Sequence, residues 1–165
     1  MNDQPQSALK LYWAFSLSCF FAFTLMLVRV PDWLSAYWPD WIELVIVYWA
    51  LVAPDRIGPV AGFIIGTMLE VLFARTFGVL STGLAVLAFL VNIAHMQLRI
   101  TSRWQQVFLL VLLVGVFKLT NLWFESLVEN ATLTGADWLS LIGNLVVWPF
   151  LNIVLDEFRR MMRIR

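Results

Sequence analysis

The chain of 165 residues is 61% hydrophobic and only 13% charged, whereas soluble domains are about 45–50% apolar and about 25% charged, so its composition predicts one integral membrane domain over residues 1–165. Its 11 basic and 11 acidic residues give a net charge of zero, which provides no basic field for nucleic acid. Cys19 is the single cysteine, which excludes an internal disulfide and a cysteine-rich metal cluster. His95 is the single histidine, which argues against a zinc site or a serine triad. We therefore expect no cofactor and no enzymatic activity.

Six apolar segments follow one another along the chain. A helix needs roughly 20 apolar residues to cross a bilayer, and the sequence predicts six transmembrane helices, at residues 9–30, 41–54, 57–74, 77–98, 104–125 and 137–155. The first segment lacks a small-residue cleavage site, so we expect it to be retained. The second is short because Pro39 and Pro54 bound it, and a half-membrane re-entrant element is the alternative. The expected fold class is therefore an all-α membrane protein.

The basic residues divide unequally between the two sides that six spans define. With an even number of spans, residues 1–8 and the basic tail 156–165 share one side with the even-numbered loops. That side carries eight basic residues: Lys10, Arg56, Arg99, Arg103, Arg159, Arg160, Arg163 and Arg165. The other side carries only Arg29 and Arg75. Because cytoplasmic loops hold the excess of Lys and Arg, we expect both termini to lie in the cytoplasm. The basic tail would anchor on anionic lipids or dock a cytoplasmic partner.

The third segment carries small residues at steps of four. Three glycines, hereafter the glycine ridge, and one glutamate share a side of the expected helix: Gly58, Gly62, Gly66 and Glu70. Small residues let another helix approach closely, and an ionisable residue within a membrane segment is a functional candidate. Internal packing is the favoured interpretation of the ridge, and docking of a partner's membrane span is the alternative. Glu70, with Arg75 and Gly78 beyond it, would contact a partner or ligand near the external face; the alternatives for Glu70 are headgroup water or an ion pair with Arg75.

The first segment carries a second stripe of small residues at the same spacing. Ala14, Ser18 and Ala22, hereafter the alanine stripe, lie four residues apart and predict another close helix contact. Internal packing is the favoured interpretation, because a six-helix protein must first hold itself together. Binding of a partner helix is the alternative.

Polar residues also recur at helical spacing in the last three segments. Asn92, His95 and Arg99 share a face, where a hydrogen-bonded structural histidine is favoured and a proton relay is the alternative. Lys118 shares a side with Asn121 and Glu125; the lysine either reaches toward headgroup water, with Glu125 offsetting its charge, or faces an internal cavity. The last segment carries a stripe that we expect to hydrogen-bond neighbouring helices: Ser140, Asn144, Trp148 and Asn152.

Several stretches of the chain occur in an order that resembles one known family. They are "RVPDWLSAYWPDWIELVIVYWALVAPDRIGPVAGFIIGTMLEVL", "FGVLSTGLAVLAFLV", "WQQVFLLVLLV" and "VVWPFLNIVLDEFRR", which together run from about residue 29 to the end. This pattern resembles the MreD family of rod shape-determining proteins, in its Gram-negative form.

The resemblance implies a non-enzymatic scaffold in the bacterial inner membrane, as part of the elongasome, the machinery of lateral peptidoglycan synthesis. Such a protein works with the bitopic protein MreC, which links the MreB filaments to RodA and its class B penicillin-binding partner. The family is also similar in fold to the six-helix substrate-binding subunits of energy-coupling-factor transporters. Those subunits meet a partner through small residues of their first helix, a role that the alanine stripe would suit. The second hypothesis is a small-molecule carrier whose cavity is lined by Asn92, Lys118 and Asn144.

Overall fold

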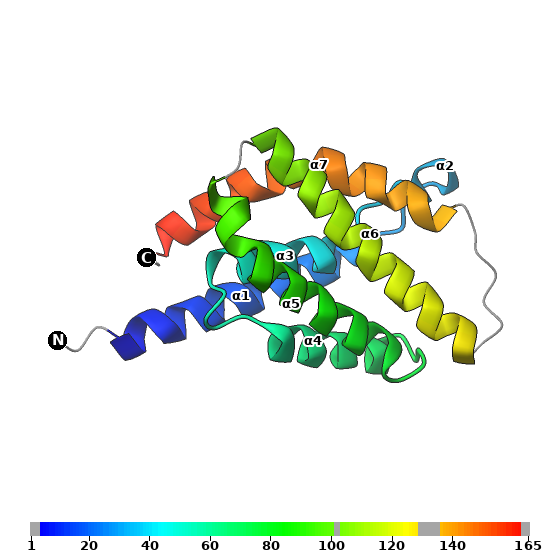
Figure 1. The fold of residues 1–165 in the computed structure, drawn as a ribbon, viewed down its shortest axis with the longest axis horizontal. Coiled ribbons are helices and arrows are strands. Elements are labelled where there is room, and N and C mark those ends of the chain that lie inside the picture. Colours follow the sequence, from blue (N-terminus) through cyan, green and yellow to red (C-terminus); the bar gives the residue numbers. More distant parts are fainter. Residues whose placement is uncertain (1–3, 101–102, 129–135, 163–165) are drawn as a thin grey trace.

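The structure, a computed structural model, describes residues 4–100, 103–128 and 136–162. These residues form helices and no strand: α1 (Gln4–Met26), α2 (Asp32–Ser35), α3 (Trp41–Val52), α4 (Pro59–Leu72), α5 (Val79–Ile100), α6 (Arg103–Val128) and α7 (Ala136–Met161) (Figure 1). The all-helical prediction is confirmed, and each of the six predicted segments overlaps one of the long helices. The short helix α2 is an addition that the apolar pattern did not predict.

The helix boundaries differ from the predicted segments by up to six residues, and two of these differences involve a proline. α1 ends at Met26, four residues before the predicted end, and Pro31 follows shortly; a proline disfavours helical geometry in the residue before it. α7 continues through Met161 although Pro149 lies inside it. Part of the expected tail at 156–165 is therefore helical.

α3 forms the centre of the fold. Nine of its 12 residues are buried, and it packs against α1, α5 and α7. A helix that is apolar on all sides is stable where protein surrounds it, which explains why this segment reads as continuously hydrophobic. Twelve residues rise about 18 Å, less than the roughly 30 Å of a hydrocarbon core. α3 is therefore too short to span a hydrocarbon core by itself, and the neighbouring helices enclose it.

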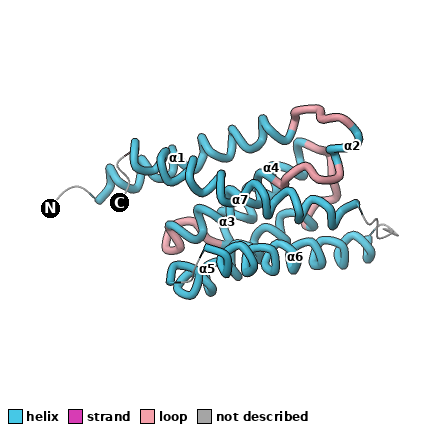
Figure 2. Tube along the Cα trace, turned by 90° about the horizontal axis from the view of Figure 1, so that it is seen from above, coloured by secondary structure: helices cyan, strands magenta, loops and turns pink. Residues whose placement is uncertain are grey.

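The ends of the helices define two ends of the bundle. The first turn of α1 and the last turn of α7 lie at one end, and α2, the α4–α5 turn and the first turn of α7 lie at the other (Figures 1 and 2). We call these the terminal end and the distal end. A chain that crosses a membrane an even number of times has both termini on the same side, and the positions of the first turn of α1 and the last turn of α7 agree with this.

The outer surface of the bundle is strongly apolar. Large hydrophobic side chains are exposed on several helices, among them Phe20 of α1, Phe63 of α4, Phe108 of α6 and Phe150 of α7. Soluble monomers rarely expose contiguous apolar patches above a few hundred Å², so a surface of this kind suits lipid. Within the described residues, two helices are long and apolar enough to cross a membrane by themselves, Ala8–Met26 and Trp138–Met161, and four apolar helices are shorter. Six crossings stay a prediction.

Candidate functional site

The glycine ridge packs against α5 within the chain. A Cβ atom on Gly66 would lie 2.3 Å from the Cα of Ser81, and one on Gly62 would lie 2.5 Å from the carbonyl oxygen of Leu84. Both neighbouring atoms belong to backbone, so α4 and α5 are in direct contact where only glycine fits. The ridge therefore makes an internal contact in this chain. That a partner also binds there stays a prediction.

Glu70 is buried at the end of α4 and caps α5. Its side chain is 1% exposed, and the carboxylate accepts hydrogen bonds from the backbone N–H groups of Gly78, at 3.1 Å, and Ser81, at 2.8 Å. The first N–H groups of a helix have no partner within the helix, and a negative charge there also complements the helix dipole. The intervening turn reverses the chain through left-handed backbone at Ala74 and Gly78. Among the described residues Glu70 makes no ion pair with Arg75.

Arg75 and Gly78 lie in this turn and are exposed. Of the residues singled out in this part of the chain, they are the ones that a second molecule could reach without displacing α5. Their predicted contact with a partner has no test in the structure.

The alanine stripe faces α3. Ala14, Ser18 and Ala22 are all buried, and α1 packs mainly on α3. The Ser18 hydroxyl donates to the carbonyl oxygen of Ala14 at 2.7 Å, so this polar group is satisfied within its own helix. The edge-to-face contact of Phe15 with Trp49, at 6.4 Å between ring centroids, strengthens the same interface.

His95 and Asn92 make structural hydrogen bonds toward the terminal end. The His95 Nδ1 donates to the carbonyl oxygen of Asn92 in its own helix, and the Asn92 amide donates to the carbonyl oxygen of Pro54 at 3.2 Å. A Cβ atom on Gly58 would lie 3.0 Å from that amide nitrogen. The favoured interpretation of His95 as a structural residue agrees with this geometry. The side chain of Arg99 lies outside the described residues.

Asp40 joins three helices at the start of α3. Its Oδ2 lies 3.0 Å from the Lys118 ammonium of α6 and accepts hydrogen bonds from two residues of α7, Ser140 at 2.9 Å and Asn144 at 3.1 Å. The backbone N–H of Asp40 also donates to Asn144 Oδ1 at 2.8 Å. Lys118 thus faces the protein interior, as the cavity alternative predicted. The side chain of Glu125 lies outside the described residues.

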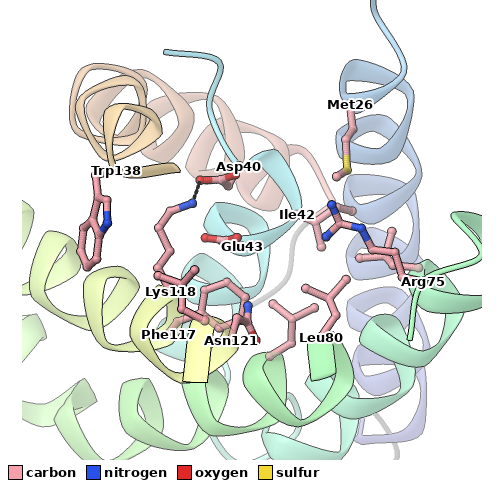
Figure 3. Close-up of a pocket in the computed structure, with 13 residues that line it drawn as sticks. Met26, Asp40, Ile42, Glu43, Arg75, Leu80, Phe117, Lys118, Asn121 and Trp138 are labelled. Carbon is pink, nitrogen blue, oxygen red and sulfur yellow. Dashed lines mark ion pairs between the residues drawn. The ribbon is translucent and has the colours of Figure 1, made fainter. Parts of the chain in front are cut away.

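A pocket of about 280 Å³ adjoins this ion pair and opens at the distal end (Figure 3). Its polar lining comes from Asp40, Glu43, Arg75, Lys118 and Asn121, and its apolar lining includes Met26, Leu69, Leu80, Leu84, Phe117, Leu122 and Trp138. All six long helices and the α4–α5 turn contribute to it. Met26 and Arg75 are the exposed members of this lining.

Glu43 and Asn121 contain buried polar atoms without partners. Figure 3 shows the Glu43 carboxyl at the centre of the pocket, below Asp40, and its Oε2 is shielded from solvent with no hydrogen-bond partner. Asn121 Oδ1 is in the same situation and lies against Gly83, where a Cβ atom would come within 2.1 Å of it. Buried polar groups normally have partners, so the Glu43 carboxyl is available to a bound donor.

A second bond between α3 and α7 lies at the terminal end. The Tyr48 hydroxyl donates to Asp156 Oδ1 at 2.8 Å, and Arg159 lies 3.4 Å from the same carboxylate oxygen. Asp40 and Tyr48 therefore fasten α3 to α7 near both of its ends. Hydrogen bonds of this kind fix the positions of helices relative to one another in a membrane, because the hydrophobic effect does not drive helices together in lipid.

The structure brings together only some of the residues that were predicted to line a common cavity. Lys118 and Asn121 line the pocket, Asn144 holds Asp40 beside it, and Asn92 lies elsewhere. The predicted cavity of Asn92, Lys118 and Asn144 is therefore not formed as a unit. Asp40 and Glu43 were missed as site residues because acidic residues are ordinary at a helix start. Lys118 could have indicated them, since a lysine within an apolar segment needs a carboxylate nearby.

The described residues define a small helical protein with an apolar outer surface and a polar pocket at one end, which is the architecture of a membrane-associated protein. A family model for rod shape-determining protein MreD matches residues 7–158. The chain is 26% identical over 160 residues to rod shape-determining protein MreD of Haemophilus influenzae, an alignment that covers 96% of this chain and 99% of that protein. No solved structure matches the chain. The chain therefore belongs to the MreD family, which gives it a role in determining cell shape.

Proposed function

We propose that this protein is a non-enzymatic scaffold of the bacterial inner membrane that binds MreC and helps organise lateral peptidoglycan synthesis. The observation that carries this proposal is the family match across residues 7–158. RodA, its class B penicillin-binding partner and the MreB filaments would be reached through MreC. The protein would act by binding and would catalyse no reaction. Its effect would be to position a partner protein in the membrane.

The outer face of α1 is the proposed contact for the single membrane span of MreC. This choice is supported by the alanine stripe and the glycine ridge, because contacts within the chain already occupy both of these surfaces. α1 packs mainly on α3, and its opposite side exposes aromatic rings, with Phe20 at 67% and Phe21 at 68%. Aromatic residues provide large contact areas at low conformational cost. The exposed Arg75 and Gly78 would meet the periplasmic part of MreC.

The proposed topology has both termini in the cytoplasm and the distal end in the periplasm. It is supported by the eight basic residues against two in the sequence and by the position of the first turn of α1 and the last turn of α7 at one end (Figure 2). Reporter fusions test it: a reporter active only in the cytoplasm should work at both termini, and one active only in the periplasm should work within the α4–α5 turn. Termini in different compartments would refute this topology.

Site-specific photocrosslinking in native membranes tests the contact face. A photoreactive phenylalanine at Phe20 should crosslink to MreC, because the face would lie against the partner's span. The same group at Phe63 of α4, which is 49% exposed, is the matched control and should crosslink at background level. Retention of MreC on the tagged wild-type protein is measured in parallel. If wild type does not retain MreC, the scaffold proposal fails; if Phe63 crosslinks and Phe20 does not, only the choice of face fails.

A second candidate function is a small-molecule binding or transport subunit of the vitamin-carrier type. The observation that favours it is the 280 Å³ pocket with Lys118 in its lining, a size close to the lower limit of small-molecule sites. Native mass spectrometry after gentle extraction distinguishes the two. A stoichiometric soluble ligand without dependence on MreC would favour the carrier, whereas retained MreC without such a ligand would favour the scaffold.

A further inference from the structure

The pocket lies where a membrane lipid can present its headgroup. It is lined by the last residue of α1, Met26, by the first turn of α3, and by Arg75 of the α4–α5 turn, all of which belong to the distal half of the bundle (Figures 1 and 3). The outer faces of the surrounding helices are apolar. A lipid in contact with those faces would have its headgroup beside the mouth of the pocket, whichever side of the membrane the distal end faces.

The interior of the pocket offers a buried acceptor to a hydrogen-bond donor. Glu43 Oε2 is buried without a partner, and a carboxylate in such surroundings is stabilised by a cationic donor. Lys118 is held by Asp40 at 3.0 Å, so its charge is already shared with another carboxylate. A bound ammonium group would satisfy the remaining acceptor and balance its charge.

The rim of the pocket offers the opposite charge. Arg75 is exposed, lines the pocket and makes no ion pair among the described residues. Figure 3 shows its guanidinium directed toward the pocket near Ile42, while Glu43 lies below Asp40. Guanidinium groups suit phosphate because their N–H donors match two of its oxygens. The pocket thus presents a buried carboxyl inside and a guanidinium among the exposed residues of its lining.

We propose that this pocket binds the headgroup of an aminophospholipid such as phosphatidylethanolamine. Its primary ammonium donates to Glu43, its phosphate contacts Arg75, and the glycerol and first acyl carbons lie along the apolar lining near Leu69 and Leu80. The volume of about 280 Å³ is near the lower end of small-molecule sites, at about 300 Å³, so there is room for a headgroup and not for a whole lipid. The inference is independent of the scaffold proposal, since it involves no partner protein.

Lipid titration followed by native mass spectrometry tests the inference. The purified full-length protein is titrated with phosphatidylethanolamine and with phosphatidylcholine of identical acyl chains, which has the same phosphate and charge but no N–H donor. Wild type should retain phosphatidylethanolamine about tenfold better, because a hydrogen bond to a charged group is worth about that factor. Glu43→Gln should remove this preference, and Arg75→Gln should weaken the binding of both lipids. Glu157→Gln and Arg56→Gln, which change exposed charges at the terminal end, are the matched controls and should bind as wild type does.

Thermal stability without added lipid, measured for every variant, shows that each is folded. The inference is overturned if wild type binds the two lipids equally, if Glu43→Gln keeps the preference while folded, or if a soluble molecule or a peptide occupies the pocket in place of lipid. Should Glu43→Gln fail to fold, Glu43→Asp provides the second variant, because it keeps the charge but withdraws the carboxylate by one methylene. A preference for phosphatidylethanolamine that is unchanged in Glu43→Asp would equally overturn the inference.

Discussion

Asp40 Oδ2 lies 3.0 Å from Lys118 Nζ, joining the start of α3 to the second half of α6 across 78 positions of sequence. The side chains are 27% and 14% exposed, so the pair is partly shielded from water. Removing one partner of such a pair leaves a charge without compensation, and that loss exceeds the net stabilisation that the pair provides.

Lys118→Met should therefore lower the thermal stability of the protein in detergent, by about 1–3 kcal/mol after allowance for partial exposure. The double variant Asp40→Asn/Lys118→Met should lose less than the sum of the two single variants, because neither charge is then left alone. Arg160→Gln is the control, since its pair with Glu157 is exposed and 3.9 Å long. Strictly additive losses would show that the two charges do not interact.

Gly66→Ala should destabilise the contact between α4 and α5. The added Cβ atom would lie 2.3 Å from the Cα of Ser81, and overpacking of this kind costs about 1–3 kcal/mol because backbone must shift. Gly115→Ala is the matched control, because nothing lies within 4 Å of its added Cβ atom; it should be neutral or stabilise α6 by up to about 1 kcal/mol. Melting temperatures in one detergent give the comparison. Equal melting temperatures for the two variants would contradict the backbone contact.

Glu70→Ala should loosen the first turn of α5. The N–H groups of Gly78 and Ser81 would lose their acceptor, and removal of a helix cap costs about 0.5–2 kcal/mol. Hydrogen exchange in nanodiscs should show faster exchange at these two amides while the second half of α4 is unchanged. Glu70→Gln, which keeps one acceptor oxygen, should give a smaller effect. Unchanged exchange in Glu70→Ala would mean that the carboxylate does not cap the helix.

Tyr48→Phe should weaken the attachment of α3 to α7 at the terminal end. The variant removes the hydroxyl that donates to Asp156 at 2.8 Å, at a cost of about 0.5–1.5 kcal/mol. Tyr12→Phe on the outer face of α1, where the side chain is exposed, is the control and should leave the melting temperature within error of wild type. A larger loss in Tyr12→Phe than in Tyr48→Phe would contradict the assignment.

Local sequence patterns predicted the helices and the surfaces on which they pack. Steps of four residues identified the glycine ridge and the alanine stripe as close-contact surfaces, and the structure buries Gly62, Gly66 and Ala14. The same spacing placed Ser140 and Asn144 on one side of the last helix, and both bond to Asp40. These predictions succeeded because the face a residue occupies depends only on helical periodicity.

The partner of each surface could not be predicted in this way. Lys118 was compared with Glu125, the carboxylate nearest on its own side of the helix, whereas the structure pairs it with Asp40 of a distant segment. Glu70 was expected at the external face, yet its carboxylate turns inward to the start of α5. In both cases the deciding contact joins segments whose relative position depends on the packing of the whole bundle.

The sequence by itself determined that this chain is helical, strongly apolar on its surface and a member of the MreD family, because composition, periodicity and residue order are properties of the chain alone. Only the tertiary structure decided that α3 is the enclosed centre and that Asp40, Glu43 and Lys118 meet at one pocket. The physical reason is that helical periodicity fixes the direction of a side chain relative to its own axis. Which neighbour it meets is set by the close packing of helices against one another.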